Sequence, residues 1–284
     1  MDENIFLKAK EVIKQADSVL ITAGAGMGVD SGLPDFRGKE GFWRAYPYAK
    51  KLGLNFQDLA NPRWFIENPR LAWAFYGHRL NLYRNTQPHE GFYILKNLVE
   101  SKNNNYFIFT SNVDGQFQKA GFDEKKIVEI HGSIHYLQCI LPCRDEIWPA
   151  DSTQVKVDME NFQALDPLPT CKNCGRVARP NILMFNDFSW IPIRTESQEF
   201  RFNLWLEKVI DLNKKLVIIE IGAGKAVPTV RLTSERIAKL TNGFLIRINP
   251  RDYDVPKNIN AISIPTGGLE GLRKIFSQFL CDII

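Results

Sequence analysis

Five short runs of apolar, mostly β-branched residues constrain the fold of this 284-residue chain more than any other feature of its sequence. The runs are continuous rather than alternating, which is typical of strands covered on both faces in a parallel sheet. Several intervening segments repeat apolar residues at three and four positions, as helices do. Strands that alternate with helices predict a doubly wound α/β layer. The predicted strands are residues 18–22, 106–110, 127–130, 216–221 and 244–248.

Each predicted strand ends in a polar or glycine-rich cluster. In open α/β sheets, ligands bind beyond the carboxyl ends of the strands, so five such clusters at one edge indicate a ligand site. The alternative is that glycine and asparagine simply form turns there. In chain order the clusters are AGAGMGVDSGLPDFRG, SNVDG, HGSIH, GAGKAVP and NPRDY.

Two segments interrupt this pattern and predict a second, smaller domain. Residues 40–87 are rich in aromatics, contain helical stretches such as residues 64–84, and show no evident strand, so we expect a helical insertion. Residues 139–180 hold four of the five cysteines and show little helical pattern, so we expect a small metal-binding module. The large domain would then comprise residues 1–39, 88–138 and 181–284.

The cysteines form two close pairs, Cys139 with Cys143 and Cys171 with Cys174, whereas Cys281 stands alone. In a reducing compartment, two close pairs indicate metal or redox chemistry before disulfides. Four thiolates suit tetrahedral Zn²⁺ and leave no open position, which favours a structural zinc over a catalytic one. We expect Cys281 to be inert and partly buried.

The charge pattern sets limits on partners and location. The 36 basic and 32 acidic residues are interspersed and give a net charge of +4, so nothing demands a nucleic acid partner. No run of about 18 apolar residues without a charge is present, and the first residues lack the pattern of a secretory signal. We therefore expect a cytoplasmic protein with no membrane partner, and the sequence does not indicate an oligomeric state.

The glycine loop after the first strand is not an ordinary dinucleotide fingerprint. Gly24-Ala25-Gly26 follows a strand, as a phosphate-binding turn should. A GxGxxG pattern would need glycine where Val29 stands, and Pro34 blocks the long helix that should follow. An ordinary hydride-transferring enzyme is therefore disfavoured.

The chain resembles the sirtuin family in seven short segments that keep the family's order and rough spacing over about residues 15–270. The glycine loop resembles the signature GAGxSxxSGIPDFR, and the others resemble TQNID, the catalytic HG, two cysteine pairs, RPxVVxFGE, GTS and IN. The matching segments are GAGMGVDSGLPDFRG from residue 24, TSNVD at 110–114, HG at 131–132, the four cysteines, ARPNILMFND at 178–187, GAG at 222–224 and IN at 248–249.

The resemblance implies an NAD-consuming enzyme with a Rossmann-like large domain and a small domain built from a zinc ribbon and a helical module. Sirtuins transfer an acyl group from a protein lysine to ADP-ribose and release nicotinamide. The resemblance therefore implies NAD and one structural Zn²⁺ as cofactors and an acylated protein as substrate.

The resemblance also implies three catalytic residues. His131 would act as general base on a ribose hydroxyl, which then attacks the alkylimidate intermediate, and an imidazole suits that task because its pKa lies near neutrality. Asn112 would lie near the ribose and carboxamide, and Asp114 would hydrogen-bond around the cofactor. Oriented dipoles and a carboxylate stabilise the positive charge that develops on the ribose.

Further positions are implied to bind NAD. Asp35 would bind the nicotinamide carboxamide region, Phe36 would shield the reactive ribose face from water, and Arg37 would contact phosphate or ribose. The other implied NAD-binding residues are Gly24, Ala25, Gly26, Ser111, Asn112, Asp114, Gly222, Ala223, Gly224 and Asn249.

Two further sets would contact the substrate. Tyr76-x-x-Arg79 resembles a pair found in sirtuins that prefer succinyl, malonyl or glutaryl lysine, and a guanidinium with a phenol can bind an acyl carboxylate. The alternative is an exposed arginine and a core tyrosine on one helix face. Leu183, Phe185 and Asn186 would border the acylated peptide, which pairs with this stretch as an added strand.

Three departures from the family pattern leave two other functions open. Ser111 replaces the usual glutamine, GAG at 222–224 lacks the hydroxyls of GTS, and Asn186-Asp187 replaces Gly-Glu. The first alternative is a protein ADP-ribosyltransferase or NAD hydrolase. The second is a non-catalytic regulator that binds NAD or ADP-ribose.

Overall fold

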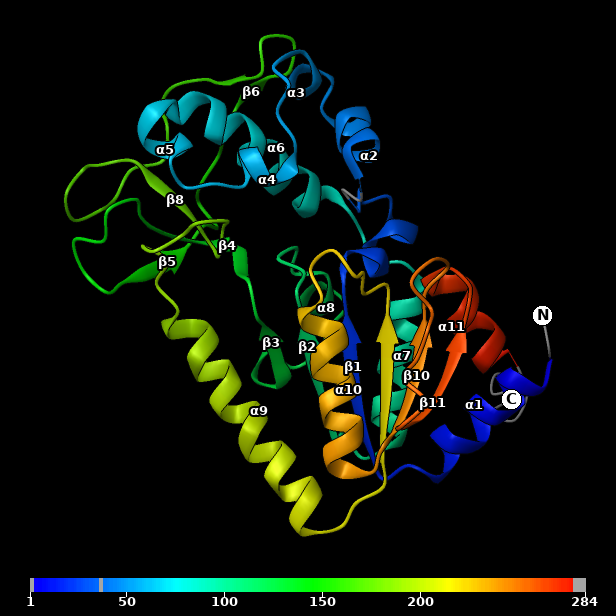
Figure 1. Ribbon diagram of the computed structural model, residues 1–284. Coiled ribbons are helices and arrows are strands. Elements are labelled where there is room, and N and C mark those ends of the chain that lie inside the picture. The colour runs from blue at the N-terminus through cyan, green and yellow to red at the C-terminus, as the bar shows by residue number, and fades with distance from the viewer. Residues whose placement is uncertain (1–2, 36–37, 278–284) are drawn as a thin grey trace.

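A computed structural model describes residues 3–35 and 38–277, without the side chains of residues 38–41. The described chain forms a large lobe around a parallel sheet and a small lobe of short helices and antiparallel strands above it (Figure 1). This arrangement confirms the predicted α/β fold class.

The large lobe is built on a six-stranded parallel sheet with the order β11-β10-β9-β1-β2-β3. All five predicted strands lie in it, although the third ends at Glu129. The sixth, β11, was not predicted. The strands are β1 (Ser18–Ala23), β2 (Tyr106–Thr110), β3 (Ile127–Glu129), β9 (Leu216–Ile221), β10 (Phe244–Ile248) and β11 (Asn260–Ile264).

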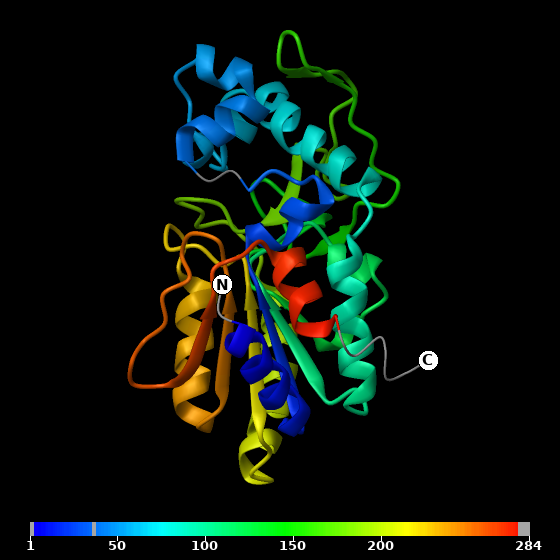
Figure 2. The same ribbon diagram turned by 90° about the vertical axis from the view of Figure 1, so that its right-hand side faces the viewer.

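Helices cover both faces of this sheet, which explains why its strands are apolar throughout. Successive side chains of β1 show the effect, because Val19 and Ile21 pack into the core on one face and Leu20 into the core on the other. One face is covered by α1 (Glu3–Gln15), α7 (Glu90–Ser101) and α11 (Gly268–Phe276), and the other by α9 (Ile193–Asp211) and α10 (Thr229–Thr241) (Figure 2). Short elements at the strand ends are η1 (Ala25–Ser31), α8 (Gln116–Lys119) and η2 (Glu124–Lys126).

The small lobe joins the two segments that interrupt the strand pattern. The helix predicted over 64–84 is divided at Asn68, whose side chain caps the second helix, with Pro69 at its first position. The helices are α2 (Gly38–Ala45), α3 (Pro47–Lys51), α4 (Phe56–Leu59), α5 (Trp64–Glu67) and α6 (Pro69–Asn85). The strands are β4 (Gly132–Cys139), β5 (Ile147–Pro149) and β8 (Ala178–Ile182) in one antiparallel sheet, and β6 (Val157–Asp158) with β7 (Gln163–Ala164).

The helices and strands of the small lobe share one hydrophobic core. Trp73 of α6 is fully buried, and its indole Nε1 donates a hydrogen bond to the carbonyl of Ala178 on β8 at 2.9 Å. This shared core supports assigning both segments to one small domain, and the boundaries at 40–87 and 139–180 stay a proposal. No helix in the described part of the chain is long and apolar enough to cross a membrane.

Candidate functional site

Two glycine loops meet at the carboxyl edge of the large sheet, because β1 and β9 are neighbours. The amide of Gly26 donates to the carbonyl of Gly222 at 3.1 Å. Gly222 has φ 65°, and a Cβ there would lie 2.4 Å from the carbonyl carbon of Gly26. A Cβ on Gly24 would lie 2.7 Å from Cα of Ala223. Only glycine permits this approach, so two of the segments predicted to bind NAD lie in contact.

Asparagine side chains from two other strand ends are held against these loops. Asn112 follows β2, is buried, and donates from Nδ2 to the carbonyl of Gly24 at 3.0 Å. Asn249 follows β10, is fully buried, and donates from Nδ2 to the carbonyl of Ala223 at 2.7 Å. The amide of Ser111 donates to the carbonyl of Ala23 at 3.1 Å. These contacts bring together four of the predicted strand ends.

His131 lies just beyond β3 and just before β4, so it joins the two lobes. Its carbonyl accepts from the amide of Leu183 at 2.9 Å, and its imidazole forms a hydrogen bond with the backbone of Ser111. Burial lowers the pKa of His131 below its ordinary value, and the bond to Ser111 opposes that effect. The imidazole is therefore neutral at pH 7 and able to accept a proton.

Asp114 is half-buried near the same strand end. Burial raises its pKa to about 6, while the hydrogen bond from the amide of Gln116 to Oδ1, at 2.9 Å, opposes the rise. The guanidinium of Arg79 on α6 also opposes the rise. Asp114 is charged at neutral pH but titrates within reach of it.

Asp35 lies at the same edge. Its carboxylate forms an ion pair with Arg251 at 2.8 Å, which ties the loop after β1 to the loop after β10. Phe36 and Arg37, which were predicted to shield the ribose and to contact phosphate or ribose, lie outside the described residues.

Tyr76 and Arg79 are both buried on α6, so the alternative of an exposed arginine is wrong. Nε and Nη2 of Arg79 donate to the hydroxyl of Tyr83 at 3.0 and 2.8 Å. The guanidinium carbon lies 5.6 Å from the ring centroid of Tyr76. The hydroxyl of Tyr76 has no hydrogen-bond partner among the described residues, which is costly for a buried phenol.

Leu183, Phe185 and Asn186 follow β8 and run past His131 toward the small lobe. The amide of Phe185 donates to the carbonyl of Ala60 at 2.9 Å, and its ring meets Phe56 edge to face. Asn186 has φ 55°, a left-handed conformation that asparagine tolerates better than most residues. This stretch therefore connects His131 to the helical module.

The four cysteines form one cluster. Their Sγ atoms all lie within 4.8 Å of one another, with Cys139 and Cys174 at 3.6 Å and Cys143 and Cys171 at 3.7 Å. Tetrahedral zinc with Zn–S bonds of about 2.3 Å needs sulfurs about 3.8 Å apart, so the cluster fits one structural zinc.

Three residues near the site were not predicted, and each acts through a partner. The hydroxyl of Tyr83 accepts hydrogen bonds from Arg79. Their i, i+4 spacing on a predicted helix could have indicated this contact. Arg251 pairs with Asp35, and it lies in the NPRDY cluster that marked the fifth strand end. Arg179 pairs with Asp187, and both side chains are fully buried.

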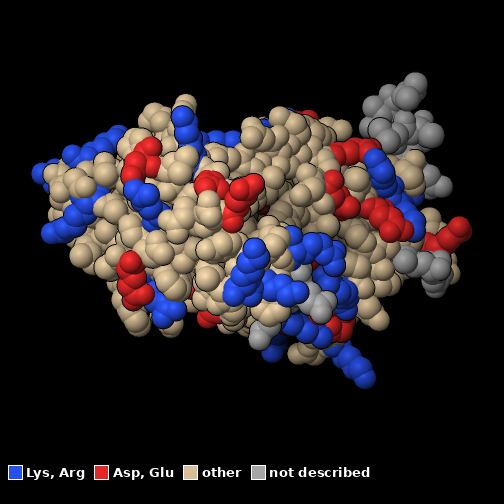
Figure 3. Space-filling model, turned by 90° about the horizontal axis from the view of Figure 1, so that it is seen from above, with Lys and Arg blue, Asp and Glu red and all other residues tan. Residues whose placement is uncertain are grey.

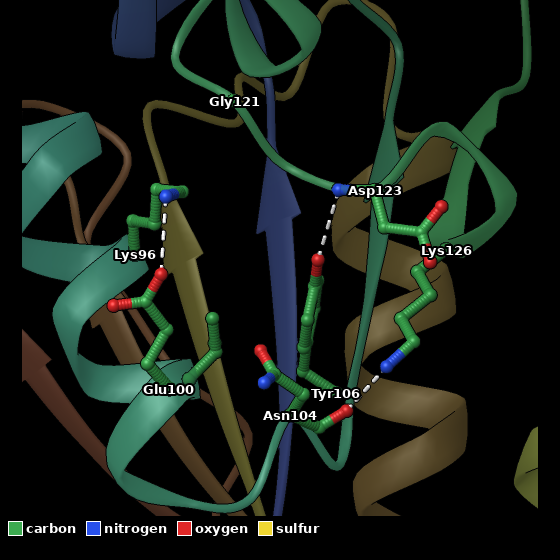
Figure 4. Close-up of a pocket in the computed structure, with 8 residues that line it drawn as sticks. Lys96, Glu100, Asn104, Tyr106, Gly121, Asp123 and Lys126 are labelled. Carbon is green, nitrogen blue, oxygen red and sulfur yellow. Dashed lines mark hydrogen bonds and ion pairs between the residues drawn. The ribbon is translucent and has the colours of Figure 1, made fainter.

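Other charged surfaces lie apart from this site. A hollow of about 350 Å³ lies at the amino ends of β2 and β3, between Lys96 and Lys126 (Figure 4). Its lysines already bind Glu100 and the carbonyl of Asn104. Seen from above, basic side chains gather in one group at the lower centre and another at the left edge, and acidic side chains form smaller separate clusters (Figure 3).

The chain is similar to known proteins over most of its length. A family model described as the Sir2 family matches residues 24–197, which is more than half of the chain. An NAD-dependent protein deacylase of Aquifex aeolicus is 28% identical over 91% of this chain and 94% of its own. Another, of Leptospira interrogans, is 32% identical over 80% of this chain and 79% of its own.

Other similar proteins include two solved complexes. A solved complex of a Sir2 homolog with NAD is 25% identical, has a TM-score of 0.72, and is matched over 100% of this chain and 96% of its own. A solved Sir2 protein bound to acetylated peptide, 19% identical with a TM-score of 0.66, shows the same fold. A probable bifunctional ADP-ribose hydrolase/ADP-ribosyltransferase of Fusarium oxysporum is 29% identical over 84% of this chain but only 41% of its own length.

Proposed function

The chain belongs to the Sir2 family and is an NAD-dependent protein deacylase of the sirtuin type, and on that premise we propose which of its residues perform the reaction. The substrate is an acylated protein. His131, Asn112 and Asp114 are the catalytic residues in this proposal. The observation that carries it is the convergence of the glycine loops, both asparagines and His131 on one sheet edge.

The residues at this edge fit NAD. Glycine at 24 and 222 lets two backbone loops pack together beyond the strand ends, where dinucleotides bind in such sheets. Asn249 holds its amide beside the second loop, and Asp35 lies at the far side of the first. When bound, NAD supplies the ribose carbon that accepts the acyl oxygen and the nicotinamide that leaves.

His131 serves as the general base. Because its pKa is lowered, the His131 ring carries only one proton at pH 7. Its unprotonated nitrogen can therefore accept a proton from a ribose hydroxyl. The hydrogen bonds from Leu183 and to Ser111 fix its backbone and ring, so little reorganisation is needed when the proton moves.

Asn112 and Asp114 stabilise the positive charge that develops on the ribose as nicotinamide leaves. The amide of Asn112 is oriented before the reaction by its bond to Gly24. Asp114 is ionised above about pH 6 and provides the negative charge.

For the acyl chain we propose that the enzyme removes acetyl groups and prefers acidic acyl groups such as succinyl. The support is that Tyr76 and Arg79 both lie buried on α6, and that the hydroxyl of Tyr76 has no partner among the described residues. An acyl carboxylate could accept from both groups. Leu183, Phe185 and Asn186 border the peptide in this proposal. A cytoplasmic location is also proposed, supported by four cysteines that form a cluster rather than disulfides.

The decisive test measures nicotinamide release with NAD alone, with an acetyl-lysine peptide and with a succinyl-lysine peptide. We expect release that depends on the acylated peptide and a larger kcat/KM for succinyl-lysine. His131→Ala should abolish deacylation, and full deacylation by that variant would refute the assigned role. Arg79→Met should remove the succinyl preference and spare acetyl-lysine.

ADP-ribosyl transfer is the second candidate, favoured by Ser111 in place of glutamine and by the Fusarium relative. Radiolabel from NAD that stays on protein, or release without any acylated peptide, would identify transfer or hydrolysis instead. The absence of turnover under every condition would leave a binding protein that regulates through NAD or ADP-ribose.

A further inference from the structure

One aromatic side chain projects almost entirely into solvent. Phe188 is 99% exposed, whereas the next most exposed large apolar residue among those described, Leu212, is 65% exposed. Phe188 lies in the loop between β8 and α9, three residues beyond Phe185. A phenyl ring in this position gives up the favourable transfer out of water that most phenylalanines obtain on folding.

The loop around Phe188 is anchored on both sides. Asp187 forms a bidentate ion pair with Arg179 at 2.6 and 2.9 Å, and both side chains are fully buried. The carboxylate of Asp187 also accepts from the amides of Met184 and Ser189, each at 3.2 Å. A buried, bidentate pair of this kind holds a backbone firmly.

A second anchor follows Phe188 directly. Nε2 of Gln138 donates to the carbonyl of Ser189 at 2.7 Å, and Gln138 is itself fully buried on β4. The backbone before and after Phe188 is therefore held by hydrogen bonds to side chains of β8 and β4. The exposed ring therefore stands on a backbone that is anchored on both sides.

The anchored loop continues the edge that borders the acyl-lysine. Leu183, at its start, is bonded to the carbonyl of His131 and is itself 39% exposed. Phe188 stands two residues beyond Asn186, where the backbone turns with φ 55°, so at most about 7 Å of chain separates it from this edge. A peptide that pairs with residues 183–186 would carry its neighbouring side chains past Phe188.

We propose that Phe188 is a docking residue for the acylated protein and binds an apolar side chain close to the acyl-lysine. The proposal rests on the proposed deacylase function and adds a sequence preference to it. Rigid aromatic anchors dominate the binding energy of many interfaces, and a preorganised anchor loses little entropy on binding. The enzyme should thus select acylated lysines that have an aromatic or large aliphatic neighbour.

The test compares wild-type enzyme with Phe188→Ala. The peptides carry the preferred acyl-lysine flanked by phenylalanine or leucine, or by serine. An acyl-lysine amide without flanking residues is the minimal substrate. We expect KM for the apolar-flanked peptides to rise about tenfold, while kcat, KM for NAD and the minimal substrate are unchanged. Phe188→Trp should restore the preference, and the melting temperature should not move.

Phe200→Ala is the matched control, because Phe200 is 64% exposed on α9. An equal loss in this control, or equal KM values for wild type and Phe188→Ala on every peptide, would overturn the proposal. A change in sedimentation with no change in peptide KM would overturn it too and indicate self-association. If wild type shows no acyl-dependent nicotinamide release at all, the deacylase function itself fails, which is a separate result.

Discussion

At the scale of single residues, the pKa values of His131 and Asp114 predict how the activity responds to acid. His131 must be neutral to accept a proton, and its pKa lies below its ordinary value of 6.5. Asp114 must be charged, and its pKa lies at about 6. Acid protonates both groups, so it removes the neutral His131 and the charged Asp114 together. We therefore expect kcat/KM for NAD to be flat from pH 7 to 8 and to fall below about pH 6.

A pH profile of single-turnover rates from pH 5 to 8 checks this expectation. The variant Asp114→Asn should lower the plateau and leave one acid limb, that of His131. An acid limb centred above pH 7 would contradict the assignment, because burial moves the pKa of His131 downward.

Asp114 also predicts a trade between activity and stability. Its folded pKa is raised, so the folded state is penalised once pH rises above the unfolded pKa of 3.8, and the penalty is complete above about 6. Asp114→Asn keeps an oxygen for the amide of Gln116 and removes the buried charge. It should therefore stabilise the protein by about 1–2 kcal/mol at pH 8, after allowance for partial exposure, and by almost nothing near pH 4.

Urea unfolding at the two pH values measures this gain. Asp158→Asn is the control in which we expect the opposite change in unfolding free energy, because hydrogen bonds from Asn161 lower the pKa of the exposed Asp158. That variant should lose stability at pH 8. A gain in both variants would show that net charge, rather than the burial of Asp114, sets the effect.

Several residues that the structure brings to one sheet edge had been singled out from the sequence, because they belong to short motifs. His131, Asn112 and Asn249 each stand next to a strand end, where chain order alone places them at one edge. The partner residues were not predicted. Arg251 meets Asp35 across 216 positions of sequence, and such a pairing depends on strand order, which the sequence pattern leaves open.

At the scale of elements, the contact between the glycine loops predicts the effect of adding one methyl group. In Gly222→Ala the new Cβ would lie 2.4–2.5 Å from backbone atoms of Gly26 and Met27, at φ 65°. Neither loop can move without disturbing its strand. We expect a loss of about 3 kcal/mol or more in unfolding free energy and loss of NAD binding.

Gly32→Ala separates the clash from backbone strain. Gly32 also has positive φ, 85°, and lies in the same loop as Gly26, but a Cβ there meets nothing within 4 Å. This variant should lose only about 1 kcal/mol and keep its affinity for NAD. Equal losses in urea unfolding would mean that left-handed strain, not loop contact, explains both glycines.

Elements buried on both faces were predicted, whereas those with a mixed pattern were not. In β11, Asn260 is exposed and the next three residues are only half-buried, so its apolar signal is weak. In β8, Arg179 and Asn181 are buried polar residues whose partners lie in β4 and the following loop. A sequence pattern scores such residues as exposed, because tertiary pairing is what permits their burial.

At the scale of the whole molecule, one strand connects the cysteine cluster to His131, the proposed general base. β4 runs from Gly132, next to His131, to Cys139, a member of the cluster. Its partner β8 pairs with it from Ala178 beside Cys139 to Ile182 beside Gly132. Loss of zinc at one end should therefore loosen the register that positions His131 at the other, which lies about 14 Å away along the four residue steps of β8.

We expect zinc removal by a chelator, or Cys143→Ser, to lower kcat for deacylation more than tenfold. NAD affinity should change less than about threefold, because the glycine loops and Asn249 belong to the large sheet, whose core is separate. Metal analysis should give one zinc per chain in the wild type, and calorimetry with NAD separates binding from turnover. Asn173→Ser, which leaves all four sulfurs in the same cysteine loop, should retain metal and activity. If NAD binding and kcat fall together, the two lobes unfold as one unit and β4 does not act as a separate connection.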